Sequence, residues 1–284
     1  MRMQIVNQMT QQDNNAALTN DKTSLGVDSR LFWDEKASEY TLPFEEKTVA
    51  RTNQVIDLLE RKGIIVAGTH ILDVGSGPGT FALPLALLGA SVTALDISDK
   101  MLLRLIAEAQ RVDVTVARTV RASWKEIDPD TEALSGAFDI VLTALSQAVE
   151  DEEDILKMEK CSRQWCVYIA TGKIQRHPTC NKIRRMLSLS LNPRPDIRNI
   201  RKTLKQMGRI FSYTSFPITI EETKTMQELA LDLARSVEAQ GRGVDQSRIL
   251  TAIATLFRDR EQHESVQCKR RSVTGVLIWR GNEK

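Results

Sequence analysis

Two carboxylates and three glycines, closely spaced around short apolar runs, are the residues best suited to chemistry. Asp73 lies near the end of the first run, Gly75, Gly77 and Gly79 follow on alternate positions, and Asp96 ends a second run. Glycine has no Cβ and tolerates positive φ, so a ligand can lie against bare backbone in such a turn. A carboxylate at the end of the second run can accept hydrogen bonds from ribose hydroxyls. The pattern predicts a nucleoside-binding half-sheet.

The spacing of the glycines separates the candidate cofactors. A dinucleotide fold reads G-x-G-x-x-G, with no acid needed just before the first glycine. Here the spacing is G-x-G-x-G, and Asp73 stands two residues ahead of Gly75. A carboxylate there would repel a pyrophosphate but suits a cation, and S-adenosylmethionine carries an α-ammonium and a sulfonium. The spacing therefore favours a methyl donor over a nicotinamide or flavin.

At these positions the chain resembles the class I S-adenosylmethionine-dependent methyltransferases. Residues 73–80 resemble their first motif, residues 95–98 with Met101 resemble their second-strand acid, and residues 138–142 resemble their fourth-strand motif. Residues 32–40 are similar to the N-terminal segment that often covers the cofactor in small-molecule members. The resemblance spans roughly residue 29 to the C-terminus and is specific in the first half only.

The resemblance implies a cofactor site and a reaction, which is direct in-line methyl transfer to a small-molecule acceptor with S-adenosylhomocysteine as product. Ser123 stands where the family often has an acid that contacts the adenine, and Trp124 beside it could pack on the adenine ring. Thr143 is expected near the transferred methyl. The implied cofactor-binding residues are Tyr40, Asp73, Gly75, Ser76, Gly77, Gly79, Asp96, Ile97, Met101, Ser123, Trp124 and Thr143.

Hydrophobic periodicity and turn residues predict alternating strands and helices, hence a parallel sheet covered on both faces. The predicted strands lie at about 70–74, 91–95, 112–117, 138–143, 165–170, 210–220 and 272–280. The predicted helices lie at about 45–62, 79–88, 98–110, from 150, 181–191, 197–207, 222–240 and 245–262. The fold class is therefore α/β, a Rossmann-like doubly wound, mostly parallel seven-stranded sheet with an antiparallel C-terminal strand. The helices at about 221–265 are expected to form a lid insertion.

Length and composition suit one large domain at 29–284 preceded by a disordered polar tail at 1–28. A net charge of +2 gives no global argument for a polyanionic partner. No apolar stretch approaches the roughly 20 residues of a membrane helix. The four cysteines lack zinc-ribbon spacing, so no metal is expected, and free thiols fit a reducing cytosol. We therefore expect a cytoplasmic protein, monomer or homodimer, with no membrane or nucleic-acid partner.

The acceptor is left open by the sequence, whether its atom is nitrogen, oxygen, sulfur or a metalloid. His177 and Tyr213 are candidates for a base or an acceptor-orienting group. The basic segment 182–209 could bind RNA, but it lacks aromatic side chains for base stacking, so a solvated helix face is preferred and an anion-binding wall is the other alternative. A cofactor-binding regulator without turnover is a further alternative, and a nicotinamide oxidoreductase is disfavoured by the glycine spacing.

Overall fold

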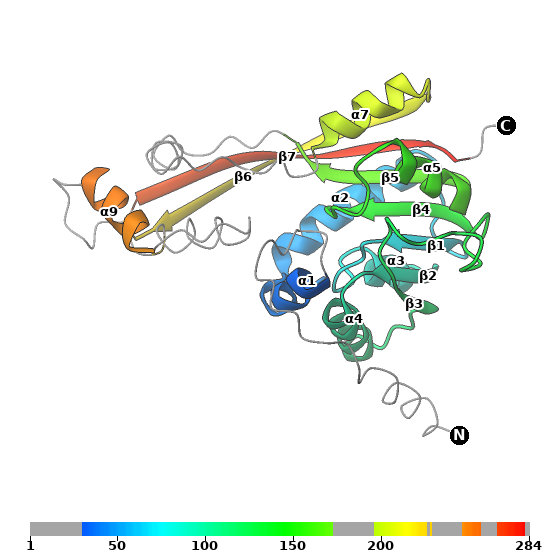
Figure 1. The fold of residues 1–284 in the computed structure, drawn as a ribbon, viewed down its shortest axis with the longest axis horizontal. Helices are drawn as coiled ribbons and strands as arrows, with labels where there is room; N and C mark the ends of the chain where they lie inside the picture. The colour runs from blue at the N-terminus through cyan, green and yellow to red at the C-terminus, as the bar shows by residue number, and fades with distance from the viewer. Residues whose placement is uncertain (1–29, 173–195, 226–227, 229–245, 257–265, 282–284) are drawn as a thin grey trace, which may run out of the picture.

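The computed structural model describes residues 30–172, 196–225, 228, 246–256 and 266–281. Seven strands form one sheet in the order β3-β2-β1-β4-β5-β7-β6 (Figure 1). Strands β1 to β5 are parallel to one another, and β7 is antiparallel to both β5 and β6. The strands are β1 (His70–Val74), β2 (Ser91–Asp96), β3 (Arg118–Arg121), β4 (Phe138–Ala144), β5 (Ser162–Thr171), β6 (Phe211–Lys224) and β7 (Val266–Arg280). The predicted seven-stranded, mostly parallel sheet with an antiparallel C-terminal strand is confirmed.

Helices cover both faces of this sheet. They are α1 (Arg30–Lys36), α2 (Glu46–Arg61), α3 (Ala82–Leu87), α4 (Asp99–Arg111), α5 (Glu152–Cys161), α7 (Ile197–Gln206) and α9 (Gln246–Leu256), with a short 3-10 turn η2 (Ala37–Glu39). One core cluster joins α2, α3 and α4 to the sheet and contains Ile140 and Leu142, whereas the other joins α5 and α7 and contains Val141. Because successive strand residues point to opposite faces, a strand covered on both sides must be apolar throughout.

Most predicted elements of the first half are found within a few residues of their expected bounds. Ser98 caps α4 as expected, because its Oγ accepts the Met101 backbone N–H at 3.1 Å. The predicted strand at 112–117 is wrong, since β3 begins only at Arg118. The chain first turns at Asp113, whose φ is 54°, and Val114 N–H then closes the end of α4 on Ala109 O at 2.9 Å. Val114 and Val116 lie in the loop between α4 and β3, and they pack against the core without joining the sheet.

Strands β6 and β7 continue past the edge at which the parallel strands end. The last pairing of β5 with β7 joins Thr171 to Thr274, but β6 and β7 remain paired over residues 217–224 and 266–273, a two-stranded segment that we call the arm. Figure 1 shows the arm leaving the sheet, with α9 near its far end. Because β6 runs parallel to β5, the arm leaves from the carboxyl ends of the parallel strands.

The arm corrects two predictions about the second half. The helix expected from residue 222 does not start there, because β6 stays extended to Lys224, and the last strand begins at Val266 rather than at 272. The reason is long-range pairing, which overrides local helical periodicity. Helix α9 does lie inside the predicted helix at 245–262. The rest of the expected helical lid, the N-terminal tail and the helix at 181–191 lie outside the described residues. Among the described helices, none combines the length and apolarity needed to cross a membrane.

Candidate functional site

The predicted turn between β1 and α3 is built from three glycines in left-handed conformation. Gly75, Gly77 and Gly79 have φ of 69°, 54° and 91°, values that residues with a Cβ rarely adopt. The backbone N–H groups of Gly75 and Ser76 both donate to Leu95 O, at 2.8 and 2.9 Å, and so tie the turn to the end of β2. The carboxyl ends of the two strands therefore meet at one point of the sheet edge.

Space lies directly beside this turn. A Cβ placed on Gly77 would meet no atom of the described residues within 4 Å, so its bare peptide faces open volume. Ser76 is buried, and its Oγ has no hydrogen-bond partner among the described residues. Because buried hydroxyls nearly always find a partner, this orphan group is suited to a bound ligand or an ordered water.

Asp73 is a buried carboxylate whose hydrogen-bonding capacity is unused. Its side chain is 1% exposed, and neither oxygen has a hydrogen-bond partner among the described residues. The pKa of Asp73 is raised to about 7, mainly because burial disfavours its charged form; the nearby Ala82 backbone N–H lowers the pKa, and the charge of Asp96 adds a smaller upward shift. An unpaired buried carboxylate is costly unless a cation joins it. This position therefore fits a positively charged ligand group.

Asp96 is also buried, but its carboxylate is held by the backbone. Its Oδ2 accepts the Gly77 N–H at 2.7 Å and its Oδ1 accepts the Ser98 N–H at 2.9 Å. Burial raises the pKa of Asp96, these amides lower it, and the charge of Asp34 raises it. Each carboxylate oxygen has a second acceptor site, so both can still receive a hydroxyl. The backbone bonds orient the carboxylate at the turn, as binding of vicinal hydroxyls requires.

The N-terminal helix is docked beside Asp96. Asp34 on α1 accepts the Ser98 hydroxyl at 2.6 Å and the Lys100 backbone N–H at 3.2 Å, and Arg30 lies 3.6 Å from Asp99. A carboxylate at the first turn of α4 is favoured by the helix dipole. The docked segment also brings Trp33 within 6.1 Å of Tyr40, ring centroid to centroid, in an edge-to-face arrangement.

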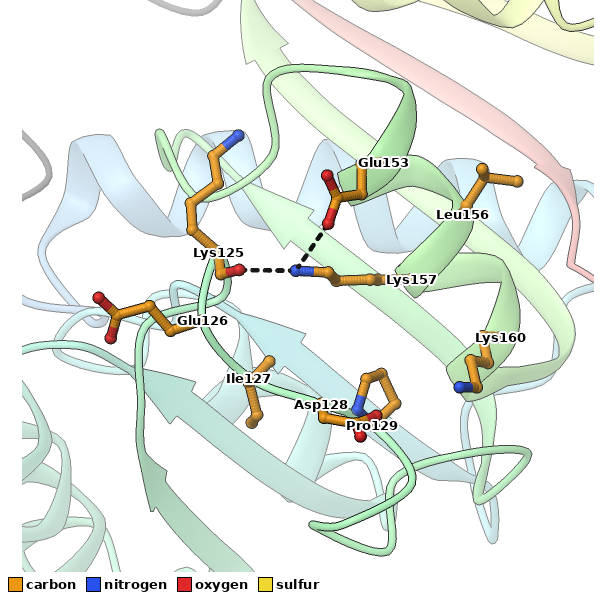
Figure 2. Close-up of a pocket in the computed structure, with 9 residues that line it drawn as sticks. All are labelled: Lys125, Glu126, Ile127, Asp128, Pro129, Glu153, Leu156, Lys157 and Lys160. Atoms are coloured by element: carbon orange, nitrogen blue, oxygen red, sulfur yellow. Dashed lines mark hydrogen bonds and ion pairs between the residues drawn. The ribbon is translucent and has the colours of Figure 1, made fainter.

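The predicted adenine residues are placed unequally. Ser123 is half-buried, but Trp124 is 2% exposed inside the core cluster of α5, so its ring is not presented at the surface. Lys157 on α5 donates to the carbonyls of Trp124 and Lys125, at 3.1 and 2.8 Å. Figure 2 shows Lys157 reaching this segment from across a pocket of about 410 Å³, which is lined by none of the predicted cofactor residues. The anchoring fixes the backbone that carries Ser123.

The remaining predicted contacts lie along the same edge. Ile97 is half-buried directly after Asp96, and Met101 is buried in the first turn of α4. Thr143 pairs with Val74 across β4 and β1, and its hydroxyl donates to Val74 O at 2.9 Å. That hydroxyl is thus already used to join the two strands.

Arg51 on α2 is a candidate site residue that the sequence analysis missed. Its Nε is buried without a partner among the described residues, and burial lowers its pKa while the nearby Tyr40 opposes this. The next residue, Thr52, donates its hydroxyl to Thr80 O at 3.5 Å, which places this part of α2 against the glycine turn. The sequence did contain a sign of this. Arg51 precedes Val55 by four residues and so lies on the same face of α2, and Val55 is fully buried.

Comparisons with known proteins agree with this geometry. Residues 71–164 match a family model described as a methyltransferase domain. The match covers about a third of the chain, from β1 into β5, and includes the glycine turn and Asp96. An uncharacterized protein of Haemophilus influenzae is 31% identical over 145 residues, which cover 51% of each chain. A ubiquinone biosynthesis O-methyltransferase of Chromobacterium violaceum is 31% identical over 126 residues, 44% of this chain and 50% of that protein. The chain thus spans about half the length of these curated relatives.

Among solved structures, a candidate sarcosine dimethylglycine methyltransferase from Galdieria sulphuraria shares the fold. The TM-score is 0.51 at 14% sequence identity, and the alignment covers 90% of this chain and 99% of that one. At this identity the likeness supports the fold alone.

Tyr213, one of the two candidate catalytic side chains, is not brought to the turn. Tyr213 lies on β6, four strands from β1 in the sheet order, a separation of about 19 Å at the usual strand spacing. Its ring lies 4.7 Å from the guanidinium carbon of Arg201 on α7. His177 lies outside the described residues.

Two arginines in the described part of the basic segment contact other residues of the chain. Arg209 makes two hydrogen bonds of 2.8 Å to Glu159, and Arg201 stacks on Tyr213. The cysteines of the described core are Cys161 and Cys166, whose thiols have pKa values raised by burial, to about 12 for Cys161. Within the described part of the chain, no cluster of three or more metal-ligating side chains occurs.

Proposed function

We propose that this chain transfers a methyl group from S-adenosylmethionine to a small-molecule acceptor. The observation that carries the proposal is Asp73, a fully buried carboxylate with both oxygens unpartnered, set two residues before a turn of bare peptide. An apo site that keeps an unpaired carboxylate out of water is matched to a cationic ligand. A dinucleotide would place a pyrophosphate against this charge.

The residues at the edge fit the groups of this cofactor. Asp73 would bind the α-ammonium, and Asp96, already oriented by two backbone amides, would accept the ribose hydroxyls. Arg51 would face the carboxylate of the amino-acid end, and Ser123 would contact the adenine. Ile97, Met101 and Tyr40 would supply apolar surface around the nucleoside. The docking of α1 through Asp34 would cover the site and exclude water.

The chemistry asks little of the protein beyond alignment. The sulfonium of the cofactor supplies an electrophilic methyl group, so no covalent enzyme intermediate is needed. The chain's own residues would hold the reacting groups in line and keep water out. For a nitrogen or oxygen acceptor a base can assist, and His177 stays a candidate for it because it comes six residues after the end of β5 in the sequence. Tyr213 is disfavoured by its distance from β1.

The test is calorimetric titration of the full chain with S-adenosylmethionine. We expect micromolar binding, and Asp96→Ala should weaken it by about tenfold or more, which corresponds to roughly 1.4 kcal/mol. A panel of phenolic acceptors, chosen because one relative is named a ubiquinone biosynthesis O-methyltransferase, would then be assayed for product. Absence of binding to the unmodified protein, or equal binding by Asp96→Ala, would overturn the proposal.

A further inference from the structure

The connection after β4 contains a strained elbow that presses against the glycine turn. Leu145 follows β4 directly and has φ of 55°, a left-handed value that a branched side chain adopts at a cost. Its backbone N–H donates to Ile169 O at 2.7 Å, so the neighbouring strand β5 holds the elbow in place. Non-glycine residues kept in this region tend to cluster at functional sites.

The elbow places Ser146 on the bare peptide of Gly75. A Cβ on Gly75 would lie 2.0 Å from Ser146 Oγ and 2.7 Å from Ser146 Cβ, distances that no real side chain tolerates. The close contact therefore requires a glycine at position 75 of the turn and a small residue at position 146 of the elbow. Ala148 Cβ is the next nearest atom, at 3.4 Å, so the contact is made by the elbow itself.

The hydroxyl of Ser146 has an unused donor among the described residues. Its Oγ accepts the Ala148 backbone N–H at 3.1 Å, and no acceptor for its own hydrogen is found in the described part of the chain. The side chain is half-buried, so a ligand in the turn can reach it. A hydroxyl can accept and donate at the same time.

We propose that Ser146 contacts the cofactor and donates a hydrogen bond to the carboxylate of its amino-acid end. This inference rests on the proposed function. If Asp73 binds the α-ammonium, the carboxylate on the same carbon must lie within a few ångströms of the turn and needs donors there. Arg51, on α2, offers the charge, and Ser146, on the β4 elbow, offers a directed hydrogen bond from the neighbouring strand. The strained Leu145 backbone is what brings this donor to Gly75.

The experiment compares three ligands that differ at the amino-acid end. Calorimetry would measure S-adenosylmethionine, S-adenosylhomocysteine and 5′-methylthioadenosine, of which the last lacks the amino acid. We expect Ser146→Ala to weaken the first two by about tenfold, the usual effect of losing a hydrogen bond to a charged group, and to leave the third within twofold. Ser146→Cys, which keeps a single heavy atom on Cβ but is somewhat larger and donates weakly, should behave in the same way. Ser135→Ala, on an exposed turn, is the control and should change none.

A second variant tests the elbow. Leu145→Val should weaken the same two ligands, because a β-branched residue disfavours the positive φ of the elbow and would no longer hold the hydroxyl against Gly75. The double variant with Ser146→Ala should bind the two ligands no more weakly than Ser146→Ala alone, since the two substitutions remove the same contact. Equal loss for all three ligands, or no loss in either serine variant, would overturn the inference and leave the proposed function standing. Failure of the unmodified protein to bind S-adenosylmethionine would overturn both.

Discussion

The glycine-turn edge of the sheet and the arm on β6 and β7 are built in opposite ways. At the turn, β1 lies between two hydrogen-bonded neighbours, and helices bury both of its faces. In the arm, residues 217–224 and 266–273 pair only with each other among the described strands. A two-stranded ribbon is marginally stable on its own in water. The difference indicates that packing in the core fixes the conformation of the turn, whereas few contacts with the rest of the sheet constrain the conformation of the arm.

The same contrast separates the two halves of the proposed function. At the turn, the packed strands hold Asp73 buried without a partner among the described residues and hold Leu145 at a positive φ, although both conformations are energetically unfavourable. The arm leaves the sheet at the same edge, on the side away from β2 and β3. We infer that cofactor binding is a property of the turn and that acceptor choice is a property of the arm. The predictions below test this division.

The largest effect is expected for Asp73→Asn. Removing the charge should weaken S-adenosylmethionine by about a hundredfold or more, because the α-ammonium would be left without its buried partner. The same change should stabilise the unliganded protein at pH 8 by on the order of 1–2 kcal/mol, since an ionised carboxylate is no longer kept out of water. Calorimetry and thermal melts measure the two effects. Asp57→Asn, on the exposed side of α2, is the matched control and should show neither.

The pH dependence follows from the same carboxyl. Because the pKa of Asp73 in the folded chain is about 7, its neutral form dominates at pH 6 and its charged form at pH 8. Affinity for S-adenosylmethionine should therefore rise across this interval. The unliganded protein should change in the opposite sense. The raised pKa contributes stability that is complete below pH 3.8, the ordinary value, and is lost as the pH rises through about 7. Titrations of Asp73→Asn should lack both trends, and trends that persist in that variant would assign them to another group.

A smaller loss of affinity is expected for Arg51→Gln. The guanidinium is not fully buried, so it should contribute less than Asp73, on the order of 1–2 kcal/mol, or about five- to thirtyfold in affinity. The effect should be confined to ligands that carry the amino-acid carboxylate, and 5′-methylthioadenosine should bind as before. Arg61→Gln, at the exposed end of the same helix, serves as the control. Equal binding of S-adenosylmethionine by Arg51→Gln would remove this residue from the site.

The smallest effect on the cofactor is expected from shortening the arm. Replacing residues 218–272 with a two-residue Asn-Gly turn should keep the cofactor dissociation constant within about twofold, because the turn shares no strand pairing with the arm. Transfer to any acceptor identified in the panel should fall sharply. Calorimetry and a product assay on the same preparation would separate the two readouts. A large loss of cofactor affinity would show that the two regions are coupled and would break the comparison.

The extent to which the sequence predicted the structure differs between the same two regions. The strand–turn–helix unit from His70 to Leu87 and the capping of α4 by Ser98 follow from local rules, namely glycine conformation, apolar runs and side-chain caps. The valines at 112–116 alternate like a strand but lie in a connection, because tertiary packing decides which alternating segment enters the sheet. In the arm, helical periodicity at residue 222 was overridden by pairing with a segment more than forty residues away.

The amino-acid sequence by itself determined the chemical character of the site, since glycine spacing and two acids specify a turn for a cationic nucleoside whatever surrounds them. It did not determine which side chains would meet at that turn. Ser146 comes from the β4 elbow and Asp34 from α1, and only folding brings them to Gly75 and to Ser98 beside Asp96. Folding likewise brings α2, which carries Arg51, against Thr80 of the turn. The physical reason is range: backbone conformation and strand polarity are local properties, whereas burial, orphaned hydrogen-bonding groups and the raised pKa of Asp73 arise only when distant segments exclude water from one another.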